Sequence, residues 1–369
     1  MAGASHCFAA RQWLSARPDA AAILVGASPV EVRPAGDGRG QGLFTTRALP
    51  AFTEILSEAP AILLRPTDDL PQLYEQYIAL REPGSDAVQM KYMALSYHDL
   101  PERDARLREK LAERGFDTGS ADEMVRVASI MQNNAFNVDL GHGTGENHRA
   151  LFLDVARINH SCAPNAHVCF YQPERPDGRG RMVIHSLRDL QANEEVLIAY
   201  FSILLPTTDR QDKASKWGFR CLCSACQPQD AAHEHQRKAI TDFTAKQAAL
   251  MHDARPTMKQ ITDLIAAGTK LIGKVDAYGR LRPAIPDLYD NIAMLRAKGL
   301  LVQRKEKQRE GVLEFLEQAT IYEAKLTGVG SPATKRRLHK LEQFAAQKDA
   351  AGSAKLVTSE NNVYSVAWT

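Results

Sequence analysis

The sequence has no run of eighteen apolar residues and no strong excess of either charge. A membrane-spanning helix needs about 20 consecutive apolar residues, so we do not expect a span. A net charge of +2 on 369 residues gives no general case for direct binding to nucleic acid. The 44% hydrophobic content can fill the cores of two or three domains. The composition therefore predicts a globular protein without a membrane or a nucleic acid as direct partner.

Cysteine is scarce, but half of it lies within six residues. Six cysteines are present, and three of them form one tight cluster: Cys221, Cys223 and Cys226. This spacing is more typical of a metal site in a reducing compartment than of disulfides, which predicts an intracellular protein, cytoplasmic and/or nuclear. A closed tetrahedral zinc site needs a fourth ligand. Cys162 is the natural candidate, with Cys169 or His233 as alternatives.

A polar stretch at residues 157–165 lies between two strand-like apolar runs, residues 150–153 and 166–171. It contains Asn159, His160, Ser161 and Cys162. Polar side chains that are buried need fixed partners, so such a stretch between buried flanks usually serves a site. Two later stretches belong with it: residues 194–201, a strand that ends at Tyr200, and residues 217–226 with the cysteines. Together they suggest a cofactor pocket, a tyrosine and a zinc ion.

Alternate glycines at residues 36–42 would let the backbone approach a ligand closely, because no side chain covers the amides. The alternative is a simple hairpin turn. The loop does not fit a dinucleotide-binding fingerprint, since strand-like sequence and not a helix follows the glycines.

Helical periodicity marks the regions on either side of the site. Residues 66–128 carry Leu70, Leu73, Tyr77 and Leu80 at helical spacing and contain no cysteine, so this lobe cannot house a zinc finger. Residues 8–25 suit an N-terminal amphipathic helix, although their composition faintly resembles a mitochondrial transit peptide. After residue 232 we expect helices over residues 233–254, 258–275, 286–301, 308–326 and 332–350.

At this point the motifs resemble those of the SET-domain methyltransferases, especially the branch of SET- and MYND-domain proteins and their fungal relatives. Gly40-Gln41-Gly42 is similar to the family's cofactor loop, and Asn134-Ala135-Phe136 to its middle segment. Asn159-His160-Ser161-Cys162 resembles the family signature. The stretch from Glu194 to Tyr200 resembles the segment with the catalytic tyrosine, and Phe219 with the three clustered cysteines resembles the post-SET zinc tail.

The resemblance implies an α+β chain: a β-rich SET fold with a helical insertion, a zinc-binding post-SET tail and an all-α C-terminal domain. The expected parts are an N-terminal helical segment (1–29), the first part of the SET domain (30–65), the insertion (66–128), the second part of the SET domain (129–205), the post-SET segment (206–228) and the C-terminal domain (229–369).

The resemblance also implies transfer of a methyl group from S-adenosylmethionine to a lysine of a protein, histone or non-histone. Tyr200 would be catalytic. The cofactor would be held by Arg39, Gly40, Gln41, Asn134, Asn159, His160, Tyr200 and Phe219. Zinc would be held by Cys162, Cys221, Cys223 and Cys226.

Two departures from the family pattern matter. Asn193 stands where the family usually has glycine, a mild change because asparagine also tolerates left-handed backbone. The inserted lobe lacks the MYND zinc finger, which leaves the substrate open. Three hypotheses remain: a protein lysine methyltransferase, a SET-fold enzyme acting on a small molecule, and a catalytically idle binding module. Retention of Tyr200 and of the full cofactor set argues against the idle module.

Overall fold

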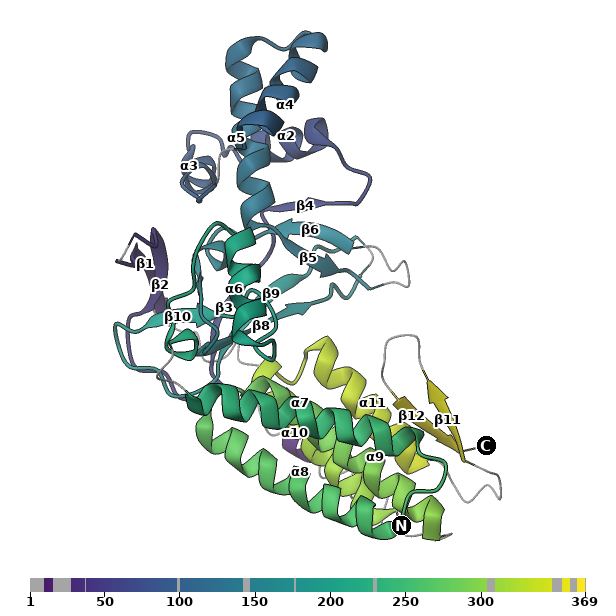
Figure 1. Ribbon diagram of the computed structural model, residues 1–369. Helices are drawn as coiled ribbons and strands as arrows, with labels where there is room; N and C mark the ends of the chain where they lie inside the picture. The colour runs from purple at the N-terminus through teal and green to yellow at the C-terminus, as the bar shows by residue number, and fades with distance from the viewer. Residues whose placement is uncertain are drawn as a thin grey trace.

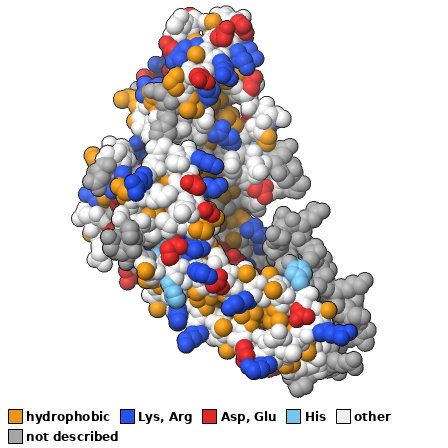
Figure 2. Space-filling view, in the orientation of Figure 1, with side chains coloured by type: hydrophobic (Ala, Val, Ile, Leu, Met, Phe, Trp, Pro, Cys, Tyr) orange, Lys and Arg blue, Asp and Glu red, His pale blue; other side chains and the backbone are white. Residues whose placement is uncertain are grey.

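The computed structural model describes residues 10–15, 28–36, 38–97, 100–141, 147–175, 177–227, 231–303 and 309–346, together with the backbone of 354–358 and 364–368. Figure 1 shows a helical lobe at the top, small sheets in the middle and a group of long helices at the bottom. The predicted α+β class, with a β-rich centre between helical regions, is confirmed. On the face shown in Figure 2, basic and acidic side chains are interspersed.

Three small sheets form the centre. The sheet that carries the candidate site has the order β1 (Val30–Pro34), β2 (Gln41–Thr45), β10 (Glu195–Ile198), β7 (Asn159–His160). The second has the order β3 (Glu54–Glu58), β9 (Arg181–Ser186), β8 (Ala166–Tyr171), and the third β4 (Ile62–Leu64), β6 (Asn147–Leu151), β5 (Phe136–Asp139). Leu43, Phe152, Ile184 and Val196 are buried in their shared core. Burial of each such side chain stabilises the fold by about 1.5–3 kcal/mol.

Strands β1 and β2 pair as an antiparallel hairpin, as the simpler interpretation of the glycine-rich loop predicted. Gly40 has a φ of +73°, which favours glycine. Asn193 has a φ of +64°, so the expected left-handed backbone at this position is confirmed.

The helical lobe follows β4. It consists of α2 (Leu70–Ile78), α3 (Ala87–Met93), α4 (Pro101–Glu113) and α5 (Thr118–Asn134). Asp117 caps α5 by accepting a hydrogen bond from the Ser120 amide at 3.1 Å, and Tyr92 is anchored by its hydroxyl, which donates to the Val127 carbonyl at 2.7 Å. The predicted border at residue 128 falls inside α5, whose buried face continues to Asn134. The lobe therefore extends directly to β5.

The C-terminal region is helical, and its helices begin and end within a few residues of the prediction. They are α7 (Ala231–His252), α8 (Met258–Tyr278), α9 (Ile285–Gln303), α10 (Glu310–Thr327) and α11 (Pro332–Ala346), with a short 3₁₀ turn η4 (Arg282–Ala284) before α9. Helix α9 is apolar on most sides because it lies between α8 and α10 in the core. Figure 1 shows α7 and α8 side by side with it.

The expectation of an all-α domain up to residue 369 was wrong at its end. Strands β11 (Ala354–Thr358) and β12 (Tyr364–Trp368) pair in an antiparallel hairpin. Their sequences, AKLVT and YSVAW, are rich in β-branched and aromatic residues, which favour strands over helices.

The expected N-terminal helix is described only over residues 10–15, which are helical; residues 1–9 and 16–27 of the predicted segment lie outside the described part. Ala10 is buried in the core of the C-terminal helices, and Arg11 donates to Glu342 at 2.8 Å. This short helix packs on the body of the protein, as the amphipathic pattern predicted.

The central sheets and the C-terminal helices meet over β8, β9 and α10. Tyr171 donates its hydroxyl to the Thr327 carbonyl at 2.6 Å. His167 and His185 lie opposite each other in the β8–β9 register. His185 is only 3% exposed, and among the described residues its Nδ1 has no hydrogen-bond partner. Burial, with a smaller contribution from His167, lowers the pKa of His185 to about 4.

This junction predicts acid sensitivity. The unfolded pKa of histidine is near 6.5, so the unfolded chain binds more protons than the folded chain between about pH 6.5 and 4. Stability that is present above this window is lost as the pH falls through it, by about 2 kcal/mol for His185 from pH 7 to pH 5. Burial also lowers the pKa of His167, although Glu323 opposes this effect.

The check is urea unfolding of wild type and His185→Gln at several pH values. The variant should lose less stability on acidification than wild type, because glutamine cannot take up a proton in the unfolded chain as His185 does. His235→Gln is the control, since His235 is exposed on α7. An identical pH dependence for wild type and His185→Gln would contradict the prediction.

Candidate active site and metal centre

The polar stretch at residues 157–165 wraps around the end of β10. Its two-residue strand β7 is parallel to β10, with Asn159 opposite Leu197 and His160 opposite Ile198. Asn165 is 3% exposed and is fully engaged: its Oδ1 accepts from the Leu197 amide at 2.7 Å, and its Nδ2 donates to the Glu195 carbonyl at 2.8 Å. The buried Asn165 side chain thus has the fixed partners expected of a buried polar group.

The approach to β7 is held by Glu58, which the sequence analysis missed. This carboxylate accepts hydrogen bonds from the amides of Leu153 at 2.6 Å, Asp154 at 3.1 Å and Val155 at 2.9 Å. These amides open the 3₁₀ turn η2 (Val155–Arg157), which leads directly into Asn159. A single glutamate on β3 carries no sequence signal that would connect it with residues 95 positions later.

The glycine-rich loop between β1 and β2 is joined to β7 through Glu195. Its carboxylate accepts from Arg39 Nη1 at 2.7 Å and from Asn159 Nδ2 at 2.9 Å. Asn159 Nδ2 also donates to the Gln41 carbonyl at 3.1 Å. A Cβ atom at Gly42 would lie 2.8 Å from Glu195 Oε1, so a larger residue there would displace this carboxylate. The structure thus brings Arg39, Gln41 and Asn159 together, and adds Glu195, which the motif contained without an assigned role.

Asn134 is placed differently. It ends α5 and is 8% exposed. Its Nδ2 donates to the carbonyls of Ser96 at 2.7 Å and Ile130 at 2.8 Å, both within the helical lobe. No described contact connects it with the Asn159 group. Its role in holding a cofactor stays a prediction.

An aromatic group surrounds His160 and Tyr200. The His160 ring lies 4.3 Å from the ring of Phe201 and 5.6 Å from that of Phe219, centroid to centroid. The Tyr200 ring lies 6.3 Å from that of Phe219, edge to face, and 5.1 Å from that of Trp217. Trp217, 39% exposed, was missed, although it stands two positions before Phe219 in the segment already singled out. It offers an accessible aromatic surface beside Tyr200.

The Tyr200 hydroxyl donates to the Ile158 carbonyl at 2.7 Å, and the Tyr200 amide donates to His160 Nδ1 at 3.1 Å. Burial, with a contribution from the Glu195 carboxylate, raises the pKa of Tyr200 above its usual value. The hydroxyl therefore stays protonated at neutral pH and is fixed in direction.

The four predicted zinc ligands converge beside this group. The sulfurs of Cys162, Cys221, Cys223 and Cys226 all lie within 4.8 Å of one another. The Sγ atom of Cys162 is 3.8 Å from that of Cys221 and 3.5 Å from that of Cys226. Sulfurs at 2.3 Å from a tetrahedral zinc ion would be about 3.8 Å apart, so the donor set fits zinc.

The alternative ligands do not join this cluster. Cys169 lies on β8, where its thiol donates to the Phe170 carbonyl, and His233 packs beside Tyr278. Helix α6 (Thr207–Lys216) positions the cluster, because the Gln211 side chain bonds both the amide and the carbonyl of Cys221 at 3.1 and 2.8 Å. A 3₁₀ turn, η3 (Ser224–Cys226), brings in the last ligand.

The thiols interact strongly with one another. Hydrogen bonding from Cys162 lowers the pKa of Cys221, and the same contact raises the pKa of Cys162. Cys162 likewise contributes to lowering the pKa of Cys223 to about 6. Thiolate is the form that binds metal, and a cation is needed before all four can ionise together. The cluster therefore has the chemistry of a metal site.

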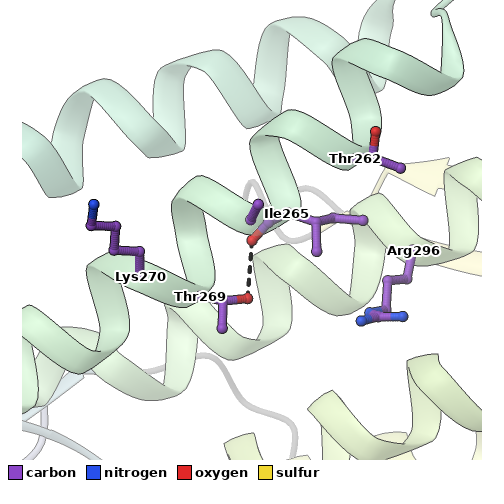
Figure 3. Close-up of a pocket in the computed structure, with 6 residues that line it drawn as sticks. Thr262, Ile265, Thr269, Lys270 and Arg296 are labelled. Carbon is purple, nitrogen blue, oxygen red and sulfur yellow. Dashed lines mark hydrogen bonds between the residues drawn. The ribbon is translucent and has the colours of Figure 1, made fainter.

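A separate cavity lies on the C-terminal helices, away from the predicted site residues. It has a volume of about 590 Å³ and is lined by Thr262, Ile265, Ala266, Thr269, Lys270 and Arg296. Figure 3 shows these side chains along an open groove between neighbouring helices. The Thr269 hydroxyl donates a hydrogen bond to the Ile265 carbonyl of its own helix. This groove holds none of the groups that methyl transfer needs.

Comparison with known proteins gives a family for the central region. Residues 40–201 match the family described as SET domain. The chain is 27% identical over 212 residues to histone-lysine N-methyltransferase set5 of Schizosaccharomyces pombe, which covers 57% of this chain and 53% of that protein. It is 34% identical over 83 residues to N-lysine methyltransferase SMYD2 of Homo sapiens, which covers 22% of this chain and 17% of that protein.

The chain thus spans about half the length of the first relative and a smaller part, 17%, of the second. A solved structure described as the SET domain of LSMT bound to lysine and AdoHcy aligns with 92% of this chain and 91% of its own at 13% identity, with a TM-score of 0.36. None of the helices that the structure describes is long and apolar enough to cross a membrane.

Proposed function

Because this chain contains a SET domain, we propose that it is an S-adenosylmethionine-dependent methyltransferase that modifies lysine side chains of a protein. The observation that supports this most is the arrangement at β7 and β10, where Tyr200 lies beside His160 within a partly exposed aromatic group. The names of the two relatives, both lysine methyltransferases, support the same acceptor. A cytoplasmic and/or nuclear location is part of the proposal.

S-adenosylmethionine would supply a methyl group activated on a sulfonium. The residues that would hold it are the loop residues Arg39, Gly40 and Gln41, with Asn159 and His160 on β7 and Phe219 as a wall; Asn134 belongs to this proposed set. A Cβ atom at Gly40 would meet no atom within 4 Å. The backbone of the loop is therefore open to an approaching molecule.

The acceptor amine must be neutral and aligned before it can attack. A free lysine has a pKa near 10.4, and transfer into an apolar surrounding disfavours its charged form. Phe201, Phe219 and Trp217 provide such a surrounding next to Tyr200. The face of Trp217 can also attract the incoming ammonium.

Tyr200 would act by position and not by proton transfer. Its hydroxyl donates to the Ile158 carbonyl and its backbone amide donates to His160 Nδ1, so the position of the hydroxyl is fixed. In-line displacement depends chiefly on alignment of the reacting atoms, and a fixed hydroxyl can hold the amine and the methyl group in line.

The first test is cofactor binding by calorimetry. We expect Asn159→Ala to weaken binding of S-adenosylmethionine by about tenfold, because the link from β7 to the Gln41 carbonyl and to Glu195 is lost. Asn137→Ala is the matched control, since Asn137 is exposed on β5. Absence of binding by folded, zinc-containing wild type would contradict the proposed function.

A further inference from the structure

A fully buried arginine lies between the cysteine cluster and the C-terminal helices. Arg210, on α6, has a side chain with 0% exposure. Its Nη2 donates to the Ala225 carbonyl at 3.1 Å, directly before the ligand Cys226, and to Thr207 Oγ1 at 3.0 Å. Its Nη1 donates to the Leu205 carbonyl at 2.6 Å and to Glu234 Oε1 at 2.9 Å. Glu234 lies on α7, so this one side chain connects the two regions.

The charge of Arg210 is not fully compensated by these partners. Glu234 is 35% exposed and also accepts from Arg237 at 2.9 Å. Two guanidinium groups therefore share one carboxylate, which leaves a positive charge in excess. Burial of a charge without compensation costs several kcal/mol, so a second source of negative charge is expected close by. Among the described residues, Arg210 Nε also has no hydrogen-bond partner.

The cysteine cluster would supply that negative charge with zinc bound. Four thiolates around one zinc ion carry a net charge of two minus. Burial by itself lowers the pKa of Arg210, but Glu234 together with the charges of Cys162 and Cys226 raises it. The hydrogen bond to the Ala225 carbonyl places the guanidinium next to the segment that carries Cys226.

We propose that Arg210 is the positioning residue and buried counter-charge of the metal centre, and that it links occupancy of the centre to the C-terminal helices through Glu234. This inference rests on the proposed zinc site. It also explains why an arginine is fully buried at this point, since hydrogen bonds to carbonyls alone do not require a permanent cation.

The test is zinc release from the purified full-length protein to a chromogenic chelator under native conditions. We expect Arg210→Gln to release zinc about tenfold or more faster than wild type, as for other residues that support metal ligands. Arg237→Gln is the matched control: it removes the other partner of Glu234, outside the cluster, and should change release by no more than about twofold. Circular dichroism and thermal unfolding establish that each variant is folded.

The inference would be overturned if folded Arg210→Gln released zinc at the wild-type rate. It would also be overturned if Arg237→Gln released zinc as fast as Arg210→Gln does. Should Arg210→Gln not fold, Arg210→Lys decides, because it keeps the charge and loses the planar fork. If Arg210→Lys releases zinc within about threefold of the wild-type rate, the counter-charge role of Arg210 is supported. If it releases zinc about tenfold faster than wild type, that role is overturned. Wild type without zinc would refute the zinc site itself, whereas zinc in wild type with unchanged release from Arg210→Gln refutes only the role of Arg210.

Discussion

Cys221→Ser should remove zinc from the protein, destabilise it by at least about 3 kcal/mol and abolish methyl transfer. Cys221 is 5% exposed and lies next to Cys162, and its backbone is fixed by Gln211. Without its thiolate the tetrahedral site cannot close, and free energy of metal binding is free energy of folding for such a segment. The segment also carries Phe219 and Trp217, so the aromatic wall of the site would be lost with the metal.

Elemental analysis and thermal unfolding check this prediction. Wild type should contain about one zinc ion per chain, since four thiolates close one tetrahedral site. Cys169→Ser is the matched control: this cysteine lies on β8 outside the cluster, so the variant should keep its zinc. A metal-free wild type that is folded and active, or equal zinc loss from both variants, would contradict the account.

Tyr200→Phe should lower turnover by about a hundredfold or more while the Kd for S-adenosylmethionine changes by less than about threefold. The phenyl ring can still pack on Trp217 and Phe219, so the pocket wall remains. What disappears is the fixed hydroxyl that donates to the Ile158 carbonyl. Loss of that bond leaves a carbonyl without its partner and should cost about 1–3 kcal/mol of stability, so folding must be checked first.

Turnover and cofactor affinity should be measured on the same preparation of this variant. Tyr97→Phe provides the control, because Tyr97 lies in the helical lobe and is 36% exposed. Equal turnover of wild type and Tyr200→Phe would mean that the hydroxyl is incidental. The chemistry would then not be that of a SET lysine methyltransferase, and a small-molecule acceptor or a binding module would become the better hypothesis.

The sequence predicted those features that depend on local chemistry. Three cysteines within six residues have few purposes other than metal binding, and the structure brings Cys162 to them from 59 positions away. Asn193 occupies the left-handed position expected of a glycine substitute. The long helices after residue 231 follow from apolar periodicity alone.

The features that were missed depend on partners far apart in the chain. Hydrogen bonds join Glu58 to the Leu153 amide, Arg39 to Glu195, and Arg210 to Glu234. The spacing of these pairs in the sequence gives no sign that they interact. The side-chain amide of Asn134 donates to the Ser96 carbonyl in the helical lobe, a contact that a motif match could not reveal. The all-α ending was wrong because the strand-forming residues of 354–358 and 364–368 were not recognised. The border predicted at residue 128 lies within α5, since helical periodicity does not mark where one structural unit passes into the next.

The most direct test of the central claim is methyl transfer itself. Purified, zinc-containing protein should be incubated with methyl-labelled S-adenosylmethionine and lysine-containing proteins, including histones, and separately with small amines. We predict that label appears on lysine of a protein substrate with wild type and is nearly absent with Tyr200→Phe. Label on small amines alone would replace the protein acceptor by a small molecule, and no label in any reaction with folded wild type would contradict the account.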